Sequence, residues 1–393
     1  MGGKETFFLP TRNFYFGYNN LMKKSPKVAL VHDYLNEFGG AERVLLTLSE
    51  IYPQAPIYTI YAKKDSPAYG QFKNKTIKES WFAGLPFAHK LISPLRFLVP
   101  LIWKSFDFSD YDLIITSASW AVTKGMKNAK HEICYLHTPP RYLYGYDTSR
   151  NWQNKWFSGF VKAYALIVNH FMRQYDFKKA QKVDKFIVNS KNVGRRVEKF
   201  YRRSDYAIIN PPINTKKFQQ KPSYQLPAAS YYLTGGRLVA AKNFDLIIRA
   251  CKKAGVTLKV FGDGIDAENL QKICGKNCKM LGRVSEVELV ALYQSAKAFI
   301  VAQRDEDFGI TPVEAAASGT PTIAYRGGGY LETVVENETG VFFDDLKTES
   351  LTEAIRKFES MKFIRKDLQK HAQKFSNEEF KKQIKTEIKR VLK

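Results

Sequence analysis

A repeated alternation of short apolar runs with amphipathic helical segments is the feature that most constrains this fold. Near-continuous apolar runs are typical of strands buried on both faces of a parallel sheet. Strands that alternate with helices predict doubly wound α/β sheets, and a pattern that stops and restarts predicts two of them. The runs cover residues 27–34, 57–62, 112–119, 131–138 and 184–190, and then 231–238, 257–264, 297–303 and 320–329.

Two domains are also expected from the length, because 393 residues exceed what a single core usually holds. The Asn-Pro-Pro sequence at residues 210–212 interrupts the strand pattern, and a polar stretch continues to Pro227, which is typical of a linker. We therefore expect a first α/β domain over residues 27–209, a second over residues 210–376, and a cleft between them.

The two ends of the chain lie outside these domains. Residues 1–26 are interpreted as an N-terminal extension, either a cloning remnant or the product of an upstream start. Residues 377–393 predict a basic amphipathic helix that packs back toward the first domain. Its apolar face is formed by Phe380, Ile384, Ile388 and Val391.

The net charge of +24 is unevenly distributed along the chain. Residues 1–209 carry 32 Lys and Arg against 16 Asp and Glu, whereas residues 210–393 carry 30 against 22. This excess of basic residues favours an anionic partner, and the candidates are a membrane surface, a diphosphate and a nucleic acid. No RNA-recognition or helix-turn-helix signature occurs, so a basic nucleic-acid-binding protein is kept only as a competing hypothesis.

The four cysteines are too few for a disulfide framework. Cys274 and Cys278 are close in sequence, but no second pair or nearby histidine completes a metal site. We therefore expect reduced cysteines, no bound metal and a cytoplasmic location. No run of eighteen uncharged apolar residues is present, and the first 26 residues lack a signal-peptide pattern.

Two glutamates, Glu306 and Glu314, flank a turn in the sequence EDFGITPVE. Phe308-Gly309 predicts the turn, and Pro312 fits the first turn of a helix, where its missing N–H costs nothing. Glu314 is then expected inside the helix and Glu306 in the loop at the carboxyl end of a strand, the edge where open α/β sheets bind ligands. Taken alone, the pair is equally typical of surface residues or of a glycosidase dyad.

Cations and glycines follow the other strands expected in the second domain. Arg237 and Lys242 are separated by four residues in the sequence GGRLVAAKN, which suits a diphosphate, since Arg grips phosphate oxygens bidentately and Lys acts as a compact charge. Gly262 ends the next strand and lets a ligand approach the backbone. After a further short apolar segment, residues 282–284 (Gly282, Arg283 and Val284) are suited to main-chain contacts with a nucleobase. These glycine motifs are neither a Walker nor a dinucleotide fingerprint.

Together these segments resemble a known family. GGRLVAAKN, VFGDG, LGRVSEVEL, EDFGITPVEAAASGTPTIAYRGGGYLETV and the N-terminal HDYLNEFGGAERV are similar to family 4 of the retaining, nucleotide-sugar-dependent glycosyltransferases. The resemblance extends from residue 27 to the C-terminus and implies the GT-B fold, in which two Rossmann-like domains face each other. HTPPRYLYGYD at residues 137–147 resembles the HTPxRY segment of a mannosyltransferase-like subgroup that acts in surface-polysaccharide assembly. Pro140 and the Tyr-Gly-Tyr at residues 144–146 depart from that pattern.

The resemblance implies donor-binding roles in the second domain. Arg237 and Lys242 would hold the donor diphosphate and neutralise the leaving group. Glu306 would face the donor sugar, and Glu314 would accept hydrogen bonds from the ribose. The backbone N–H groups beside Glu306 belong to Phe308, Gly309 and Ile310.

The resemblance also implies roles in the first domain. Gly39 and Gly40 would let the first loop close over the phosphates, with the following helix N-terminus adding positive potential. His137 would lie near the reacting sugar, and Arg141 and Tyr142 would lie on the acceptor side.

The preferred hypothesis is therefore retaining transfer of a hexose, with mannose from GDP-mannose favoured, onto a saccharide or a polyprenyl-diphosphate-linked acceptor. The resemblance implies no cofactor and no metal. A UDP-glucose or UDP-N-acetylhexosamine donor and an inactive sugar-nucleotide-binding relative are the alternatives, whereas a glycosidase would leave Arg237 and Lys242 without a role. Apolar, aromatic and basic residues at 81–108 and 154–182 predict peripheral association with the cytoplasmic face of a membrane.

Overall fold

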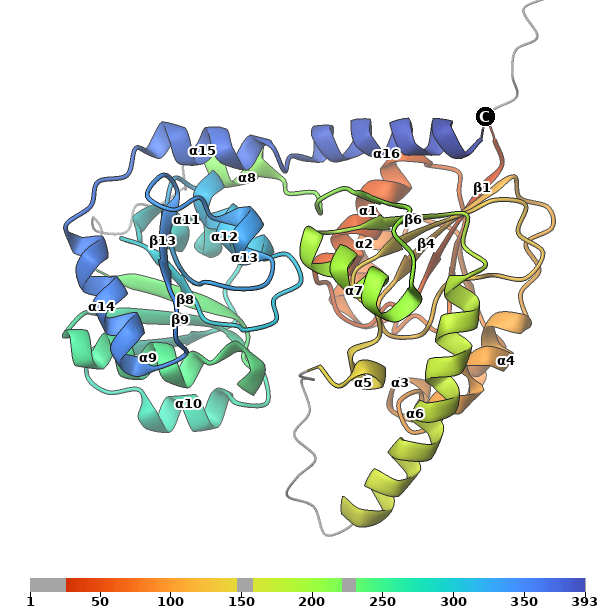
Figure 1. The fold of residues 1–393 in the computed structure, drawn as a ribbon, viewed down its shortest axis with the longest axis horizontal. Helices are drawn as coiled ribbons and strands as arrows, with labels where there is room; N and C mark the ends of the chain where they lie inside the picture. The colour runs from red at the N-terminus through yellow and green to blue at the C-terminus, as the bar shows by residue number, and fades with distance from the viewer. Residues whose placement is uncertain (1–25, 147–157, 221–230, 393) are drawn as a thin grey trace, which may run out of the picture.

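The chain forms two α/β domains that lie next to each other, as Figure 1 shows. The computed structural model describes residues 26–146, 158–220 and 231–392. Residues 1–25 of the predicted extension, and the start of the predicted membrane segment at residues 154–157, lie outside the described residues.

The first domain is built on a parallel sheet. Its strands are β1 (Val28–His32), β2 (Ile57–Thr59), β3 (Ile77–Glu79), β4 (Leu113–Ala118), β5 (Glu132–Leu136), β6 (Lys185–Val188) and β7 (Tyr206–Ile208). Its helices are α1 (Gly40–Ile51), α2 (Pro67–Phe72), α3 (Ala88–Leu91), α4 (Val99–Lys104), α5 (Arg141–Tyr144), α6 (Ser158–Ala180) and α7 (Lys191–Tyr201), with 3-10 helices η1 (Trp81–Gly84) and η2 (Arg96–Leu98). The strand order is β3-β2-β1-β4-β5-β6-β7. All five strands predicted here are confirmed.

The second domain repeats this plan. Its strands are β8 (Tyr232–Arg237), β9 (Leu258–Asp263), β10 (Cys278–Gly282), β11 (Phe299–Val301), β12 (Thr322–Tyr325) and β13 (Gly340–Phe343), in the order β10-β9-β8-β11-β12-β13. Its helices are α8 (Thr215–Gln219), η3 (Ala240–Lys242), α9 (Phe244–Ala254), α10 (Ala267–Ile273), α11 (Glu286–Ser295), α12 (Ile310–Ala317), α13 (Tyr330–Thr333) and α14 (Thr348–Glu359). The predicted pair of doubly wound sheets is thereby confirmed.

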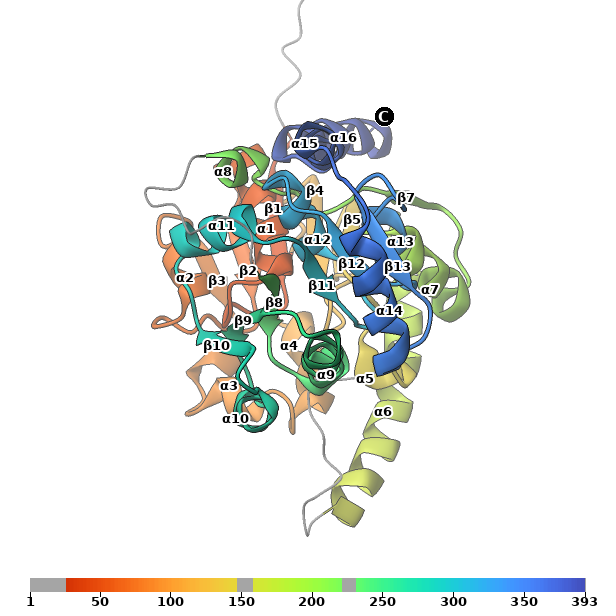
Figure 2. The ribbon, with the colours of Figure 1, turned by 90° about the vertical axis from the view of Figure 1, so that its left-hand side faces the viewer.

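Two helices at the end of the chain connect the domains. Helix α15 (Arg365–Gln373) packs on α12 of the second domain, and α16 (Asn377–Val391) continues across to the first, nearly in line with it (Figures 1 and 2). Phe380, Ile384 and Ile388 of α16 are buried in the core of the first domain. The Phe380 ring lies 5.8 Å from the Tyr135 ring, so the end of the chain fastens the two domains together.

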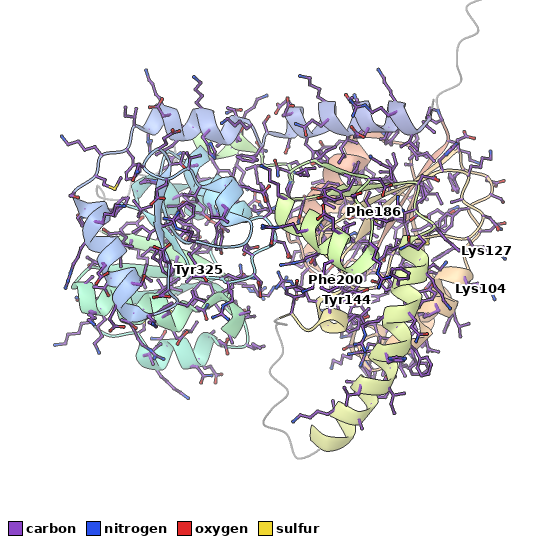
Figure 3. The ribbon with its side chains drawn as sticks, in the orientation of Figure 1. Lys104, Lys127, Tyr144, Phe186, Phe200 and Tyr325 are labelled. Atoms are coloured by element: carbon purple, nitrogen blue, oxygen red, sulfur yellow. A yellow bond between two sulfur atoms is a disulfide. The ribbon has the colours of Figure 1, made fainter. Side chains whose placement is uncertain are left out.

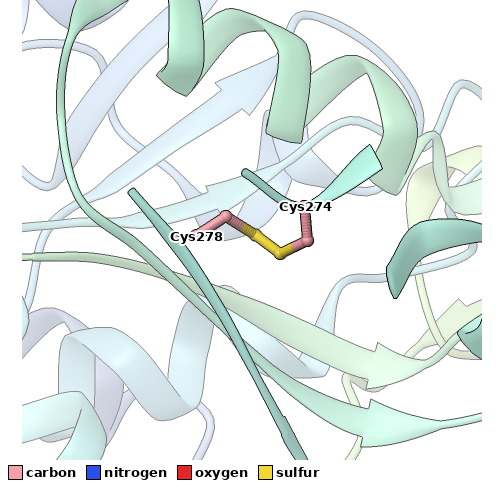
Figure 4. Close-up of a disulfide and its surroundings, with 2 residues drawn as sticks. All are labelled: Cys274 and Cys278. Atoms are coloured by element: carbon pink, nitrogen blue, oxygen red, sulfur yellow. A yellow bond between two sulfur atoms is a disulfide. The ribbon is translucent and has the colours of Figure 1, made fainter. Parts of the chain in front are cut away.

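The cysteines correct one prediction. Cys274 and Cys278 form a disulfide that joins the end of α10 to the start of β10 (Figure 4). Their Cα atoms are 5.2 Å apart, within the range that a disulfide requires. The prediction of reduced cysteines was wrong for this pair, because the sequence gives no sign that the turn between α10 and β10 brings the two side chains together. Cys134 and Cys251 are free and buried.

None of the helices in the described part of the chain combines the length and the apolar character needed to cross a bilayer.

Candidate functional site

Each sheet contains a point at which the strand order reverses, between β1 and β4 in the first domain and between β8 and β11 in the second. Ligands of open α/β sheets bind beyond the carboxyl ends of the strands at such a point. β1 ends at His32 and β8 ends at Arg237. Arg237 forms an ion pair with Glu37 in the loop that follows β1, so the candidate site lies where the two edges meet.

The predicted diphosphate site lies at the end of β8. Arg237 is 56% exposed, and a Cβ atom built on Gly236 would lie 3.4 Å from Lys242 Nζ, so both cations border the same turn. A Cβ atom on Gly262 would lie 1.9 Å from the Gly236 carbonyl oxygen, and the φ of Gly262 is +111°. Only glycine permits this close approach. Arg237 also forms an ion pair of 2.9 Å with Glu37 of the first domain.

The residues predicted to face a nucleobase lie at the end of β10. Gly282 has a φ of +67°, and Val284 is partly buried against the core. The Arg283 side chain is 80% exposed and donates to Asp263 Oδ2 over 3.1 Å. Asp263 therefore ties the ends of β9 and β10 together.

The two glutamates lie in different surroundings. Glu314 is 2% exposed inside α12, where it pairs with Arg43 of α1 and accepts from the Tyr293 hydroxyl over 3.3 Å. Glu314 raises the pKa of the Arg43 guanidinium. Glu306 lies in the loop before α12, and among the described residues its carboxylate has only long hydrogen bonds, 3.4 Å from the Tyr330 hydroxyl and 3.3 Å from the Asp307 N–H. The predicted ribose acceptor is thus paired, and Arg43 was missed by sequence reasoning.

The glycine loop of the first domain contacts the glutamate loop of the second. Gly39 caps α1, and a Cβ atom on Gly40 would lie 2.7 Å from Ile310 Cδ1. Gly309 precedes α12 with a φ of +92°, while Phe308 is buried beneath the turn. The N-termini of α1 and α12, which carry free N–H groups and positive potential, therefore lie close together.

His137 follows β5 and is 8% exposed. Its Nε2 lies 2.9 Å from Ser117 Oγ, and Ser117 Oγ lies 3.1 Å from His32 Nδ1. Burial lowers the pKa of His137 to about 4, with a further contribution from His32, so the ring is neutral near pH 7. Asn189 holds the backbone of His137 by donating to its carbonyl over 2.9 Å.

Arg141 connects the domains beside His137. It donates to the Asp305 carbonyl over 2.6 Å and to Asp307 Oδ1 over 2.8 Å. Arg196 of α7 contacts the same Asp307 carboxylate, a partner that no sequence motif indicated.

Two buried polar atoms in the segments that follow β5 and β11 have no hydrogen-bond partner among the described residues. One is the hydroxyl of Tyr142, whose ring lies 5.2 Å from that of Trp120, and the other is Oε1 of Gln303, just beyond β11. Buried polar atoms are usually paired, so each marks a place for a ligand group or a water molecule. Gln303 was missed because a single glutamine after a strand carries no signal of its own.

No group of three His, Cys, Asp or Glu side chains suited to a metal occurs in the described ranges. Two cavities lie away from the facing edges. One, of about 350 Å³, is lined by Tyr144, Arg173, Gln174, Phe177, Lys178 and Phe200, and Figure 3 marks Tyr144 and Phe200, whose rings stack at 4.2 Å. The other, of about 290 Å³, lies between α9 and the start of α14.

The arrangement defines a GT-B protein, with two doubly wound domains that meet at their ligand-binding edges. Residues 38–217 match the model of Glycosyltransferase Family 4, and residues 216–375 match the model of glycosyl transferases group 1. The chain belongs to the family 4 glycosyltransferases, which confirms the resemblance seen in the sequence.

Curated relatives match parts of the chain. An uncharacterized glycosyltransferase of Methanocaldococcus jannaschii is 27% identical over 216 residues, which are 54% of this chain and 60% of the relative. A GDP-mannose-dependent alpha-(1-6)-phosphatidylinositol monomannoside mannosyltransferase of Mycobacterium tuberculosis is 28% identical over 193 residues, 43% of this chain and 50% of the relative. The chain therefore spans about half the length of these relatives.

Solved structures share the fold. The Anabaena protein HepE in complex with UDP-glucose has a TM-score of 0.69 at 17% identity, over 93% of this chain and 100% of that chain. Sucrose-phosphate synthase from Thermosynechococcus elongatus has a TM-score of 0.71 at 18% identity, over 93% of this chain and 99% of the other.

Proposed function

We propose that this protein transfers a hexose from a nucleotide sugar to a saccharide or lipid-linked acceptor, with retention of the anomeric configuration. The observation that carries the proposal is the set of groups at the carboxyl edge of the second sheet. Arg237 and Lys242 supply positive charge beside a backbone that only glycine permits. Glu306 lies in the loop that follows β11, the strand next to β8 in the sheet.

Catalysis then consists mainly of charge stabilisation. As the bond between the sugar and the diphosphate breaks, negative charge develops on the diphosphate, and Arg237 and Lys242 offset it. Glu306, which has only weak partners, is available to accept hydrogen bonds from the sugar hydroxyls. The acceptor hydroxyl attacks from the face that the diphosphate leaves and gives its proton to the departing diphosphate, so the step needs no nucleophile from the protein. As the family resemblance implies, we expect no metal.

Donor binding is expected to separate two ion pairs between the domains. Glu314 and Arg237 are the residues proposed to bind the donor. In the structure Glu314 is paired with Arg43, and Arg237 is paired with Glu37. The pair of Arg237 is exposed and is worth little. The Glu314 carboxylate is buried, so the ribose hydroxyls must share it with Arg43 or replace Arg43 as its partner.

GDP-mannose is the favoured donor. The HTPPRYLYGYD segment resembles a mannosyltransferase subgroup, and the Mycobacterium tuberculosis relative is described as GDP-mannose-dependent. A UDP-sugar is the alternative, because HepE is described in complex with UDP-glucose and shares the fold.

A thermal-shift panel of GDP-, UDP- and ADP-sugars tests donor binding, since a ligand bound only to the native state raises the unfolding temperature. We expect GDP-mannose to give the largest shift, Lys242→Ala to lose it, and Lys253→Ala to retain it. Lys253 is a matched control, because it pairs with Glu349 on the surface of the same domain. A panel without any shift in the wild-type protein would contradict the proposal.

We also propose that the first domain rests on an anionic membrane. Leu166, Ile167 and Phe171 are 73%, 62% and 64% exposed on α6, which projects from this domain (Figure 1). Phe87 and Leu101, from the other predicted segment, are 68% and 56% exposed, and Lys104 follows on the same helix as Leu101 (Figure 3). Apolar side chains flanked by cations suit an anionic interface.

Vesicle flotation tests this proposal. The protein should float with anionic vesicles at low salt and should not float with neutral vesicles. Failure to float with either kind of vesicle would contradict membrane association.

A further inference from the structure

A chain of polar side chains runs from α1 to His137 through the interior of the first domain. Glu42 Oε1 lies 3.5 Å from His32 Nε2. The contacts from His32 Nδ1 through Ser117 Oγ to His137 Nε2 are the 3.1 Å and 2.9 Å contacts described above. His32 and Ser117 are 1% and 0% exposed, so water does not interrupt the chain.

The direction of these hydrogen bonds is fixed at the Glu42 end. Burial raises the pKa of Glu42, but His32 and the N–H of Gly39 outweigh it, so the pKa is lowered and the carboxylate is ionised. A carboxylate only accepts, so His32 Nε2 must donate to it. When His32 is neutral, its Nδ1 accepts from Ser117, and Ser117 Oγ in turn accepts from His137 Nε2–H. His137 Nδ1 then carries no hydrogen and is an acceptor.

Protonation of His32 reverses the chain. Both nitrogens of a histidinium donate, so Ser117 Oγ must accept from His32 Nδ1, and the Ser117 hydrogen is then available to His137 Nε2. His137 itself stays neutral, since burial lowers its pKa to about 4. When Ser117 donates to its Nε2, a neutral His137 carries its hydrogen on Nδ1. Nδ1 has no hydrogen-bond partner among the described residues and is therefore available to a ligand.

We propose that Ser117, His32 and Glu42 are positioning residues that set whether His137 Nδ1 accepts or donates a hydrogen bond toward the bound sugar. The ligand in this inference rests on the proposed function, whereas the hydrogen-bond chain is a property of the protein alone. With Nδ1 as an acceptor, His137 can take a hydrogen bond from a sugar hydroxyl. With Nδ1–H it can only donate.

The charged groups around the chain decide which state is populated. Burial lowers the pKa of His32, but Glu42 from α1 and Asp33 from the end of β1 outweigh it, so the pKa is raised above 6.5. Asp33 is itself held by the Ser119 and Trp120 N–H groups, and Asp307 faces His137 from the second domain. Because the pKa of His32 is raised, the donor state of His137 is populated at lower pH and the acceptor state as pH rises above that pKa.

Long-range ¹H–¹⁵N NMR spectra of the full chain, labelled at histidine and free of ligand, test the inference. His371 is an internal reference, because its Nε2 lies 3.1 Å from the Thr333 carbonyl and must donate to it. At about pH 9, well above the ordinary histidine pKa, His137 should show the same Nε2–H pattern as His371. As pH falls, His137 should change to the Nδ1–H tautomer in step with the titration of His32, without becoming cationic. Spectra of His137→Gln and His32→Gln assign the signals.

Two variants separate the relay from a merely structural role. In Glu42→Gln the amide oxygen must still accept from the Gly39 N–H, which is 2.8 Å from Glu42 Oε2, so the NH₂ group faces His32. This reverses the chain, and His137 should be Nδ1–H even at about pH 9, well above the ordinary histidine pKa. In Ser117→Ala the His137 signals should no longer follow the titration of His32, while those of His371 stay unchanged.

An unchanged His137 tautomer in Glu42→Gln, or a wild-type His137 that ignores the titration of His32, would overturn the inference. If Glu42→Gln fails to fold, the spectra of Ser117→Ala test the inference by themselves: His137 signals that still follow the titration of His32 would overturn it. The measurement needs no donor, so a failure of the relay and a failure of donor binding are separate results.

Discussion

The two domains share a topology but place their ionisable side chains differently. The first domain buries His32, Asp33, Lys124, Glu132, His137, Asp176 and Arg196. Among the described residues of the second domain, residues 231–376, the buried ionisable side chains with acidic or basic charge are Glu314 and His371. Its basic site residues Arg237 and Arg283 are 56% and 80% exposed instead.

This difference teaches how each domain contributes to the site. Exposed cations at strand ends in the second domain form only solvated ion pairs, which a charged ligand can replace at little cost. Buried charges are costly unless they are paired, so those of the first domain must hold the protein itself. Glu132 is an example, since it accepts from the N–H groups of Gly125 and Met126 and fixes that loop. Burial raises the pKa of Glu132 to about 7.

The largest effect is expected from breaking a buried pair in the first domain. Lys124 is 1% exposed and pairs with Asp176, which also accepts from the Tyr144 hydroxyl over 2.6 Å. Lys124→Met leaves Asp176 buried without its cation and should lower the free energy of unfolding by about 3–5 kcal/mol. Urea unfolding measures this change. The double variant Lys124→Met/Asp176→Leu should recover much of it, and a single variant within about 1 kcal/mol of wild type would contradict the comparison.

In the second domain, the backbone at the end of β9 should be the sensitive point. Gly262→Ala places a Cβ atom against the Gly236 carbonyl in a left-handed conformation, which costs on the order of 1–3 kcal/mol and displaces the turn beside Lys242. We expect lower thermal stability and loss of the donor-induced thermal shift. Gly275→Ala is the matched control, because its Cβ atom would meet nothing within 4 Å. Equal donor shifts in both variants would show that the turn has no role in binding.

Membrane binding should depend on the first domain only. Leu166→Glu/Phe171→Glu removes two exposed apolar side chains, each worth about 1.5–3 kcal/mol when buried. Partitioning onto anionic vesicles should fall by more than about tenfold in co-sedimentation, since tenfold corresponds to about 1.4 kcal/mol. Ile364→Glu changes a side chain that is 64% exposed in the second domain and should have no effect. If Ile364→Glu lowered vesicle binding and Leu166→Glu/Phe171→Glu did not, the membrane-binding surface would lie on the second domain.

The smallest effect is expected from an exposed pair. Lys253 Nζ lies 2.7 Å from Glu349, and the two side chains are 49% and 64% exposed. Lys253→Ala should change the free energy of unfolding by less than about 1 kcal/mol, because exposed pairs are solvated and screened. The same urea experiment that measures Lys124→Met checks this, and a loss as large as that of Lys124→Met would remove the distinction between buried and exposed charge.

The two sheets and most of their strands could be predicted from the sequence, because strands buried on both faces of a parallel sheet have near-continuous apolar sequences. Sequence reasoning missed β3, β7 and β10, in which no residue is fully buried, so they have no such run. It also missed β13 (GVFF), although this strand is buried throughout. The strand has only four residues and begins with glycine, so its apolar sequence is too short to be recognised.

The site was predicted unevenly for a related reason. Arg237, Lys242 and Glu306 follow strands of one sheet, and local motifs mark them. Arg43 and Arg196 meet Glu314 and Asp307 only after two domains assemble, and their sequence separations are 271 and 111 residues. Contacts of that range leave no local pattern in a single sequence.

The most direct test of the central claim is sugar transfer or donor hydrolysis with GDP-mannose, measured as released GDP. Wild type and Lys253→Ala should turn over. Lys242→Ala should lose both turnover and GDP binding, whereas Glu306→Ala should keep GDP binding and lose turnover by about 10²–10³-fold. Full activity in both Lys242→Ala and Glu306→Ala would contradict the placement of the donor at this edge of the second domain.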